Sequence, residues 1–247
     1  MSSLYQSYPC SKTNALNVVL LQGWGMNTGV WQRLLPYLQD TFHVTVIDAT
    51  IDINEMLAIA PQRAIWCGWS LGGLCAMTIA THYPERVQAV VMIACNPCFV
   101  AREDWPNAMS VANFQAFQQG LTINPEATLK RFIALQCQGS SSQKQDARWL
   151  QQQLAMTPFP PLAVFQAGLE TLKAADFRPQ LARIKHPVYT ILGHEDVLVP
   201  SSVANDLVGV NPQMQCLAIA GAAHVPFVSH PQIVADKLWQ IAQECCE

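Results

Sequence analysis

A serine lies between two glycines in the segment Gly68-Trp69-Ser70-Leu71-Gly72, which follows a short apolar run at residues 64–67. This G-x-S-x-G pattern predicts a sharp strand-to-helix turn that exposes the serine hydroxyl. The chain folds back on itself at such a turn, so the residues two before and two after the serine must be small, as Gly68 and Gly72 are. The pattern therefore predicts that Ser70 is the nucleophile of a hydrolase.

A nucleophilic serine needs a histidine to accept its proton and a carboxylate to fix the imidazole tautomer. After a turn of this kind the expected chain order is serine, acid, histidine. Among six histidines, His224 follows the apolar run 214–219 through a loop of small residues, which can bring a side chain across the top of a sheet. His224 is therefore predicted as the base. Three other histidines are less suitable. His194 is expected to be solvated, His186 lies before a predicted strand, and His230 is expected to cap a helix.

The acid that orients the base is expected directly after the apolar run 187–192. Glu195 and Asp196 are neighbours there and point in different directions, so only one of them can meet His224. The apolar residues and proline that follow favour Asp196. Asp48 also ends a predicted strand, but it precedes the serine and would break the expected order.

Two backbone N–H groups are needed to stabilise the oxyanion that forms when a serine attacks an ester. The residue after the nucleophile, Leu71, supplies one of them at the start of a predicted helix. The glycine-flanked turn after the first apolar run, Gln22-Gly23-Trp24-Gly25, is expected to supply the N–H of Trp24.

The elements that must position these residues alternate along the chain. Short apolar runs separated by helical stretches indicate a parallel sheet buried on both faces, and so an α/β fold with a mostly parallel, doubly wound sheet. The predicted strands are residues 17–21, 43–47, 64–67, 87–94, 187–192 and 214–219, and the predicted helices are 31–38, 71–83, 201–208 and 231–244.

Residues 99–176 break this alternation. They contain helical patterns, among them 125–137, 144–156 and 161–174, and no convincing strand; the breaker Pro158-Phe159-Pro160-Pro161 separates the last two. We therefore expect a helical cap at 99–176, inserted into a core made of 1–98 and 177–247, over the carboxyl edge of the sheet where open α/β sheets bind ligands.

Composition narrows the classes of function. Of the 247 residues, 51% are hydrophobic and 13% charged, and the net charge is −3, so nothing favours disorder or nucleic-acid binding. No run approaches the length of a membrane span, and the first residues do not resemble a secretory signal. The nine cysteines do not have the spacing of a zinc site, and we expect them to be reduced core residues of a cytoplasmic protein. We expect Cys245 and Cys246 to lie in a frayed C-terminus; the alternative is that they are lipidated.

The chain resembles α/β-hydrolases throughout and, within them, the pimeloyl-[acyl-carrier protein] methyl ester esterases of biotin synthesis, the BioH family. The segments that carry the resemblance are Gly23-Trp24-Gly25, 66–74, 82–89, Pro97-Cys98-Phe99, 131–136 in the predicted cap, and 224–231. The cap segment discriminates most, because the serine turn alone would fit many esterases.

The resemblance implies hydrolysis of a methyl ester on a pimeloyl chain carried by acyl-carrier protein, with no cofactor or metal, by a monomer. It implies that Ser70, Asp196 and His224 are catalytic. Substrate contacts are implied for Trp24, Ser70, Leu71, Phe132, Ile133, Ala134, Leu135, Gln136 and His224. It also implies that Arg131, Lys144 and Arg148 dock the acidic carrier, although Lys144 and Arg148 also fit a solvated pair on one helix face.

Two features depart from the family pattern. Gln22 stands where the family usually has histidine, and segment 48–56 is shorter than the family's and lacks its glycine-rich loop. Both bear on substrate preference. Two other readings therefore stay open at this point: a carboxylesterase of broad specificity that acts on free short-chain esters, and a non-catalytic binding module with the same fold.

Overall fold

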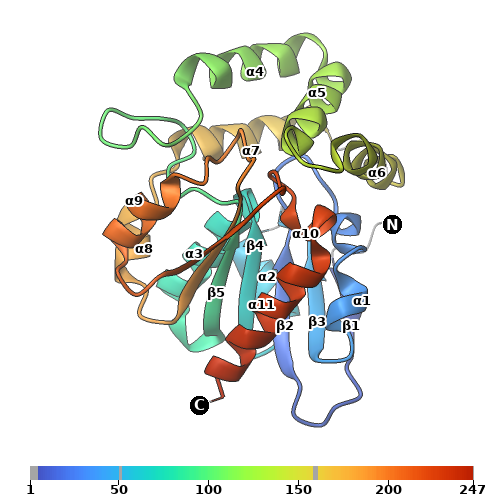
Figure 1. Ribbon diagram of the computed structural model, residues 1–247, viewed down its shortest axis with the longest axis vertical. Helices are drawn as coiled ribbons and strands as arrows, with labels where there is room; N and C mark the ends of the chain where they lie inside the picture. The colour runs from blue at the N-terminus through green and yellow to red at the C-terminus, as the bar shows by residue number, and fades with distance from the viewer. Residues whose placement is uncertain (1–4, 50–51, 158–160, 247) are drawn as a thin grey trace.

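The computed structural model describes residues 5–49, 52–157 and 161–246. Within these ranges the chain forms one seven-stranded sheet with helices on both faces (Figure 1). The strand order is β1-β3-β2-β4-β5-β6-β7, and every neighbouring pair is parallel except β1 with β3. The predicted α/β class is confirmed. The strands are β1 Tyr5–Tyr8, β2 Leu16–Leu21, β3 Phe42–Ile47, β4 Ala64–Trp69, β5 Val87–Ile93, β6 Val188–Gly193 and β7 Gln215–Ile219.

All six predicted strands are present, with ends that differ by at most two residues. Strand β1 was not predicted. It pairs antiparallel with β3 at the edge of the sheet, and its four residues are exposed or half-buried. A strand without a buried face has no apolar pattern, so the sequence carries no signal for it.

Successive residues of the central strands point into two separate cores. On β2, Val19 and Leu21 belong to one apolar cluster, whereas Val18 and Leu20 belong to the other. Because side chains alternate across a strand, a strand that is apolar at every position must be covered on both faces. Helices α2, α3, α8 and α9 contribute to the first cluster, and α1, α10 and α11 to the second.

The helices of the core are α1 Leu35–Leu38, α2 Ile53–Ile59, α3 Leu71–His82, α8 Arg178–Arg183, α9 Val203–Val210, α10 Pro226–Ser229 and α11 Pro231–Glu244. Of the core helices, α3, α9 and α11 match predicted helices to within two residues, whereas α2, α8 and α10 are not among the predicted elements. The helix expected at 31–38 is wrong: a 3₁₀ turn, η1 (Thr28–Trp31), is followed by the short α1. Pro36 explains the break, because proline has no N–H for a continuous helical ladder and favours the first turn. A second 3₁₀ turn, η2 (Pro84–Arg86), precedes β5.

Four helices gather at one end of the sheet, above the core (Figure 1). They are α4 Val111–Ile123, α5 Pro125–Cys137, α6 Gln143–Ala155 and α7 Leu162–Ala174. The last three match the expected helices to within a residue, whereas α4 is not among the helices that the sequence analysis specifies. The division at 99–176 stays a prediction, and most of the proline-rich breaker, residues 158–160, lies outside the described ranges.

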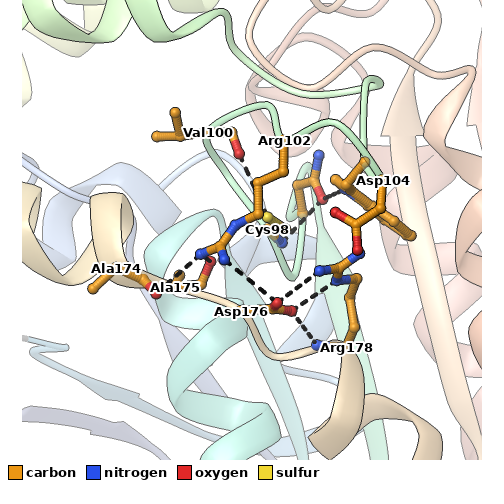
Figure 2. A network of polar contacts seen from close by, with 10 residues as sticks. Cys98, Val100, Arg102, Asp104, Ala174, Ala175, Asp176 and Arg178 are labelled. Carbon is orange, nitrogen blue, oxygen red and sulfur yellow. Dashed lines mark hydrogen bonds and ion pairs between the residues drawn. The ribbon is translucent and has the colours of Figure 1, made fainter.

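The two ends of the predicted cap are tied together by a polar network (Figure 2). Arg178 binds Asp176 through two hydrogen bonds of 2.8 and 2.7 Å and reaches Asp104 at 2.8 Å. Arg102 donates to the carbonyls of Ala174 and Ala175, at 3.4 and 3.3 Å. Segment 102–104 leads into the helices and segment 174–178 leads out of them, so the network fixes entry and exit side by side.

In the described part of the chain, no helix combines the length and the apolar character needed to cross a membrane. All nine cysteines are free, and five of them are buried. Cys75 is half-buried, in partial agreement with the expectation of a core residue, and Cys246 is exposed at the end of the chain.

Candidate active site

The predicted site residues follow the carboxyl ends of neighbouring parallel strands. Strand β2 pairs with β3 on one side and β4 on the other, with Leu21 opposite Gly68. The chain therefore leaves β2 and β4 at the point where the strand order reverses, which is where open α/β sheets form a crevice. Gly193 at the end of β6 likewise lies opposite Ile219 at the end of β7.

Ser70 sits in a strained turn between β4 and α3. Its φ is 53° and its ψ −116°, a conformation that non-glycine residues adopt only where the surroundings impose it. A Cβ on Gly68 would lie 2.1 Å from the carbonyl oxygen of Gly72, and a Cβ on Gly72 would lie 2.4 Å from that of Leu21. Only glycine therefore fits at either position, and this confirms the packing reason for the pattern.

Asp196 and His224 form a buried pair. His224 Nδ1 lies 2.7 Å from Asp196 Oδ2, and both side chains are fully buried. Asp196 Oδ1 accepts the N–H groups of Leu198 and Val199, at 2.8 and 3.0 Å. Since the carboxylate accepts from Nδ1, that nitrogen carries the proton and Nε2 is left with a free lone pair.

Two contacts that the sequence did not reveal hold the backbone of His224. The indole N–H of Trp69, the residue before Ser70, donates to the His224 carbonyl at 2.8 Å. The N–H of His224 donates to the carbonyl of Gln136, at the end of α5, at 3.0 Å. The first contact joins the histidine loop to the serine turn, and the second joins it to the predicted cap.

His224 Nε2 is buried and has no hydrogen-bond partner within the described ranges. Ser70 as a whole is 7% exposed, and no hydrogen bond joins its hydroxyl to the imidazole there. An unpaired buried polar atom is costly and rare, so it calls for a functional reason. Catalytic hydrogen bonds are often long without substrate, and an Nε2 kept free is what a base needs.

Trp24, the predicted second oxyanion donor, lies in the turn that follows β2. Gly25 has a φ of +75°, and Met26 N–H donates to the Gly23 carbonyl at 3.4 Å, so the turn depends on glycine. In the parts of the chain that the structure describes, the Trp24 N–H has no acceptor. Leu71 begins α3, where the first N–H groups of a helix lack partners within it.

A cavity of about 580 Å³ adjoins these two residues. It is lined by Trp24 and Leu71, by residues of α3 and by residues of α7. From the shortened segment, Ala49, Asp52 and Ile53 contribute to its wall, while residues 50 and 51 lie outside the described ranges. Burial raises the pKa of the Cys75 thiol in this wall to about 11, so it stays protonated at neutral pH.

The predicted substrate contacts on α5 divide into two groups. Phe132 and Leu135 line a second cavity, of about 490 Å³, and the ring of Phe132 packs edge-on against Trp24. Ile133 is buried in the core and Ala134 is exposed, and neither lines the two cavities. Gln136 is buried and meets the site through its carbonyl.

The three predicted docking residues are exposed, on two different helices. Arg131 is on α5 and lines the second cavity, whereas Lys144 and Arg148 are on α6. Helix α6 is held to the core by Arg33, whose Nη1 lies 2.7 Å from Oδ1 of the buried Asp146.

The rejected alternatives lie away from this arrangement. His194 and Glu195 are exposed and 3.4 Å apart, as expected of solvated groups. His230 is the N-cap residue of α11, but its side chain makes no capping bond, so the expected cap is wrong; the ring bonds Ser229 instead. Asp48 accepts a hydrogen bond from the buried Gln22 at 2.7 Å, so these two residues pair beside the turn.

Within the described ranges, no group of three or more His, Cys, Asp or Glu side chains could hold a metal ion. Separately, the serine turn, the imidazole with an unpaired Nε2 and the helix N-terminus supply the kinds of group that nucleophilic attack on an ester requires.

Comparison with known proteins identifies the family of the chain. A family model described as the alpha/beta hydrolase fold matches residues 51–231. The chain is 38% identical over 242 residues to the pimeloyl-[acyl-carrier protein] methyl ester esterase of Yersinia enterocolitica, covering 92% of this chain and 93% of that protein. The chain belongs to the α/β-hydrolase family and, within it, to that of these esterases.

Two further proteins place the chain in the same family and fold. The pimeloyl-[acyl-carrier protein] methyl ester esterase of Edwardsiella ictaluri is 39% identical over 240 residues, with coverage of 92% and 93%. Among solved structures, a bromoperoxidase from Bacillus anthracis superimposes with a TM-score of 0.85 at 19% identity, covering 97% of this chain and 94% of that one. At that identity the second likeness concerns the fold alone.

Proposed function

We propose that this chain is a serine carboxylesterase that hydrolyses the methyl ester of pimeloyl-[acyl-carrier protein], releasing methanol. The observation that carries the proposal is 38–39% identity, over nearly the full length of the chain, to esterases named for that reaction. The buried Asp196–His224 pair, at the same edge of the sheet as Ser70, supports it. The proposal includes a monomeric, cytoplasmic enzyme with residues 99–176 as its cap.

In the proposed reaction, Ser70 Oγ attacks the ester carbonyl while His224 Nε2 accepts the hydroxyl proton. Asp196 holds the imidazole through Nδ1 and stabilises its protonated form. The N–H groups of Trp24 and Leu71 receive the negative oxygen of the tetrahedral intermediate. When the C–O bond breaks, methanol leaves with the proton from His224, and an acyl-serine remains. Water then repeats the sequence and releases the free carboxyl group.

The deciding experiment compares two substrates with the purified protein. The proposal expects kcat/KM for the carrier-bound methyl ester to exceed that for a free p-nitrophenyl ester by about 100-fold or more, because binding through remote contacts raises kcat/KM. Similar values would favour the carboxylesterase of broad specificity that acts on free short-chain esters. Growth of a biotin-requiring strain that lacks its own esterase would test the same proposal in cells.

Ser70→Ala separates catalysis from binding. It should abolish turnover of both substrates and labelling by a fluorophosphonate, because the nucleophile is gone. It should leave the melting temperature nearly unchanged, since the hydroxyl makes no hydrogen bond in the described part of the chain. Retained turnover would overturn the mechanism, and an unlabelled wild-type protein would point to a binding module.

A further inference from the structure

The side chain of Trp24 is held by the helices above the sheet. Its indole N–H donates to the carbonyl of Phe165, on α7, at 2.8 Å. Its ring meets those of Phe117, Phe132 and Phe165 edge-on, with centroids 5.2–5.5 Å apart. Trp24 is 4% exposed and also lines the 580 Å³ cavity, so the ring is closely packed on the sides where these contacts lie.

Gly168 is the residue of α7 that lies against this indole. A Cβ at Gly168 would lie 2.4 Å from Cδ1 of Trp24 and 2.9 Å from its Nε1. Glycine is unfavourable in a helix interior, and Gly168 lies well inside α7 (Leu162–Ala174). The contact therefore explains the residue: without a side chain, α7 can receive the indole against its backbone.

A displacement of the indole would reach the backbone of the turn. Trp24 lies between Gly23 and Gly25, and a Cβ on Gly25 would lie 3.0 Å from Leu129 Cδ1, so the turn is closely packed too. Three phenylalanine rings pack against the indole, so a push on the indole that its side chain cannot accommodate by rotating would displace the Trp24 backbone. An oxyanion donor must lie within a few tenths of an ångström of its position to act.

We propose that Gly168 is a positioning residue: it lets α7 clamp the Trp24 indole and thereby aims the Trp24 N–H at the oxyanion. This inference rests on the proposed function, in which that N–H stabilises the tetrahedral intermediate. It assigns the helical segment a part in the chemistry, in addition to covering the site.

The primary test is Gly168→Ala with a free p-nitrophenyl ester, so that carrier docking plays no part. The expected result is a fall in kcat of about 10- to 100-fold, below the loss for complete removal of an oxyanion donor, with KM changed by less than about threefold. Affinity for a trifluoromethyl ketone, which forms a tetrahedral adduct, should fall in parallel. Unchanged kcat in the folded variant would overturn the inference.

Gly209→Ala is the matched control. Gly209 also lies inside a helix, α9, but a Cβ there would meet nothing within 4 Å. It should keep wild-type kcat. If both alanine variants lost kcat equally, the effect would be a general one of helical glycines and the inference would fail.

A double-mutant cycle distinguishes positioning from a general structural defect. Trp24→Ala removes the indole but keeps the backbone N–H, so adding Gly168→Ala should then cost no further activity. Additive losses would overturn the proposal. If Gly168→Ala does not fold, Trp24→Phe, which lacks the indole donor, should lower kcat at constant KM, and unchanged kcat would again contradict it. Failure of the proposed function would look different, because the wild-type protein would then lack Ser70-dependent turnover.

Discussion

At the scale of single residues, the two oxygens of Asp196 have separate tasks. Oδ1 accepts from Leu198 and Val199 and fixes the carboxylate, whereas Oδ2 receives Nδ1–H of His224. The carboxylate thus cannot rotate away, and the tautomer with a free Nε2 is the only one that the pair accommodates.

Replacement of Asp196 by asparagine tests this division. The amide oxygen of Asp196→Asn would keep the two backbone N–H groups, so its NH₂ group would face Nδ1 and force the proton onto Nε2. We expect kcat to fall by a factor on the order of 10⁴, as for the same change in a serine protease triad. Stopped-flow acylation rates would measure this, and a loss below tenfold would contradict the assigned role. The exposed neighbour offers a control, Glu195→Gln, which should retain its activity.

The sequence was informative about these residues because chain order and the glycine spacing restrict the choice to one serine, one histidine and a pair of adjacent acids. It could not reveal the contacts that support them. The Trp69 indole and the His224 carbonyl are 155 residues apart, and Trp24 and Phe165 are 141 apart. No local pattern encodes such a pair, so Gly168 shows only as an unexplained glycine in a helix.

At the scale of elements, sequence reasoning succeeded where an element has a buried face and a clear boundary. Helix α5 begins at Pro125 and presents buried residues at helical spacing, and its bounds were found without error. Helix α4 was not named, although Ser110 caps it and Phe114 and Leu121 are buried at helical spacing. That signal was available, whereas the half-exposed β1 had none.

The network in Figure 2 gives an element-scale prediction about pH. Hydrogen bonds from Arg178 lower the pKa of Asp176 below its usual value, so the charged form is favoured in the folded state. A group of this kind stabilises the fold above its unfolded pKa, and the contribution is lost as the pH falls through the folded pKa. Asp176→Asn should therefore lower the free energy of unfolding at pH 7, and the difference from wild type should shrink in acid.

Urea unfolding from pH 8 to pH 3 would measure this difference. The matched control is Asp40→Asn, since Asp40 is exposed and should show a small difference at every pH. If Asp176→Asn lowered the free energy of unfolding by the same amount at pH 7 and pH 3, the charge of Asp176 would not be what stabilises the two ends of the helical segment.

At the scale of the whole molecule, the fold was predictable because alternating strands and helices admit few topologies. The partner is a separate question, and it depends on the surface. Changing Arg131, Lys144 and Arg148 together to alanine should lower kcat/KM for the carrier-bound ester, most strongly at low salt, where exposed charges are least screened. Turnover of a free ester should stay within about twofold of wild type, because the serine site is untouched.

A second triple variant controls for net charge. Lys12, Arg183 and Lys185 are also exposed basic residues, but they precede β2 and β6 and so lie toward the opposite edge of the sheet. Their replacement by alanine removes the same charge and should leave the carrier-bound reaction nearly unchanged. Equal losses from both triples, or equal losses on both substrates, would defeat the docking proposal.

The hydrogen bond from the His224 amide to Gln136 also matters to anyone who would re-engineer this esterase. Deleting the predicted cap, residues 99–176, or replacing it with the cap of another hydrolase is an obvious way to seek a new selectivity. Here such an exchange would remove the carbonyl of Gln136, which accepts the N–H of His224. A chimera would need a carbonyl rebuilt at that spot before its new specificity could be judged.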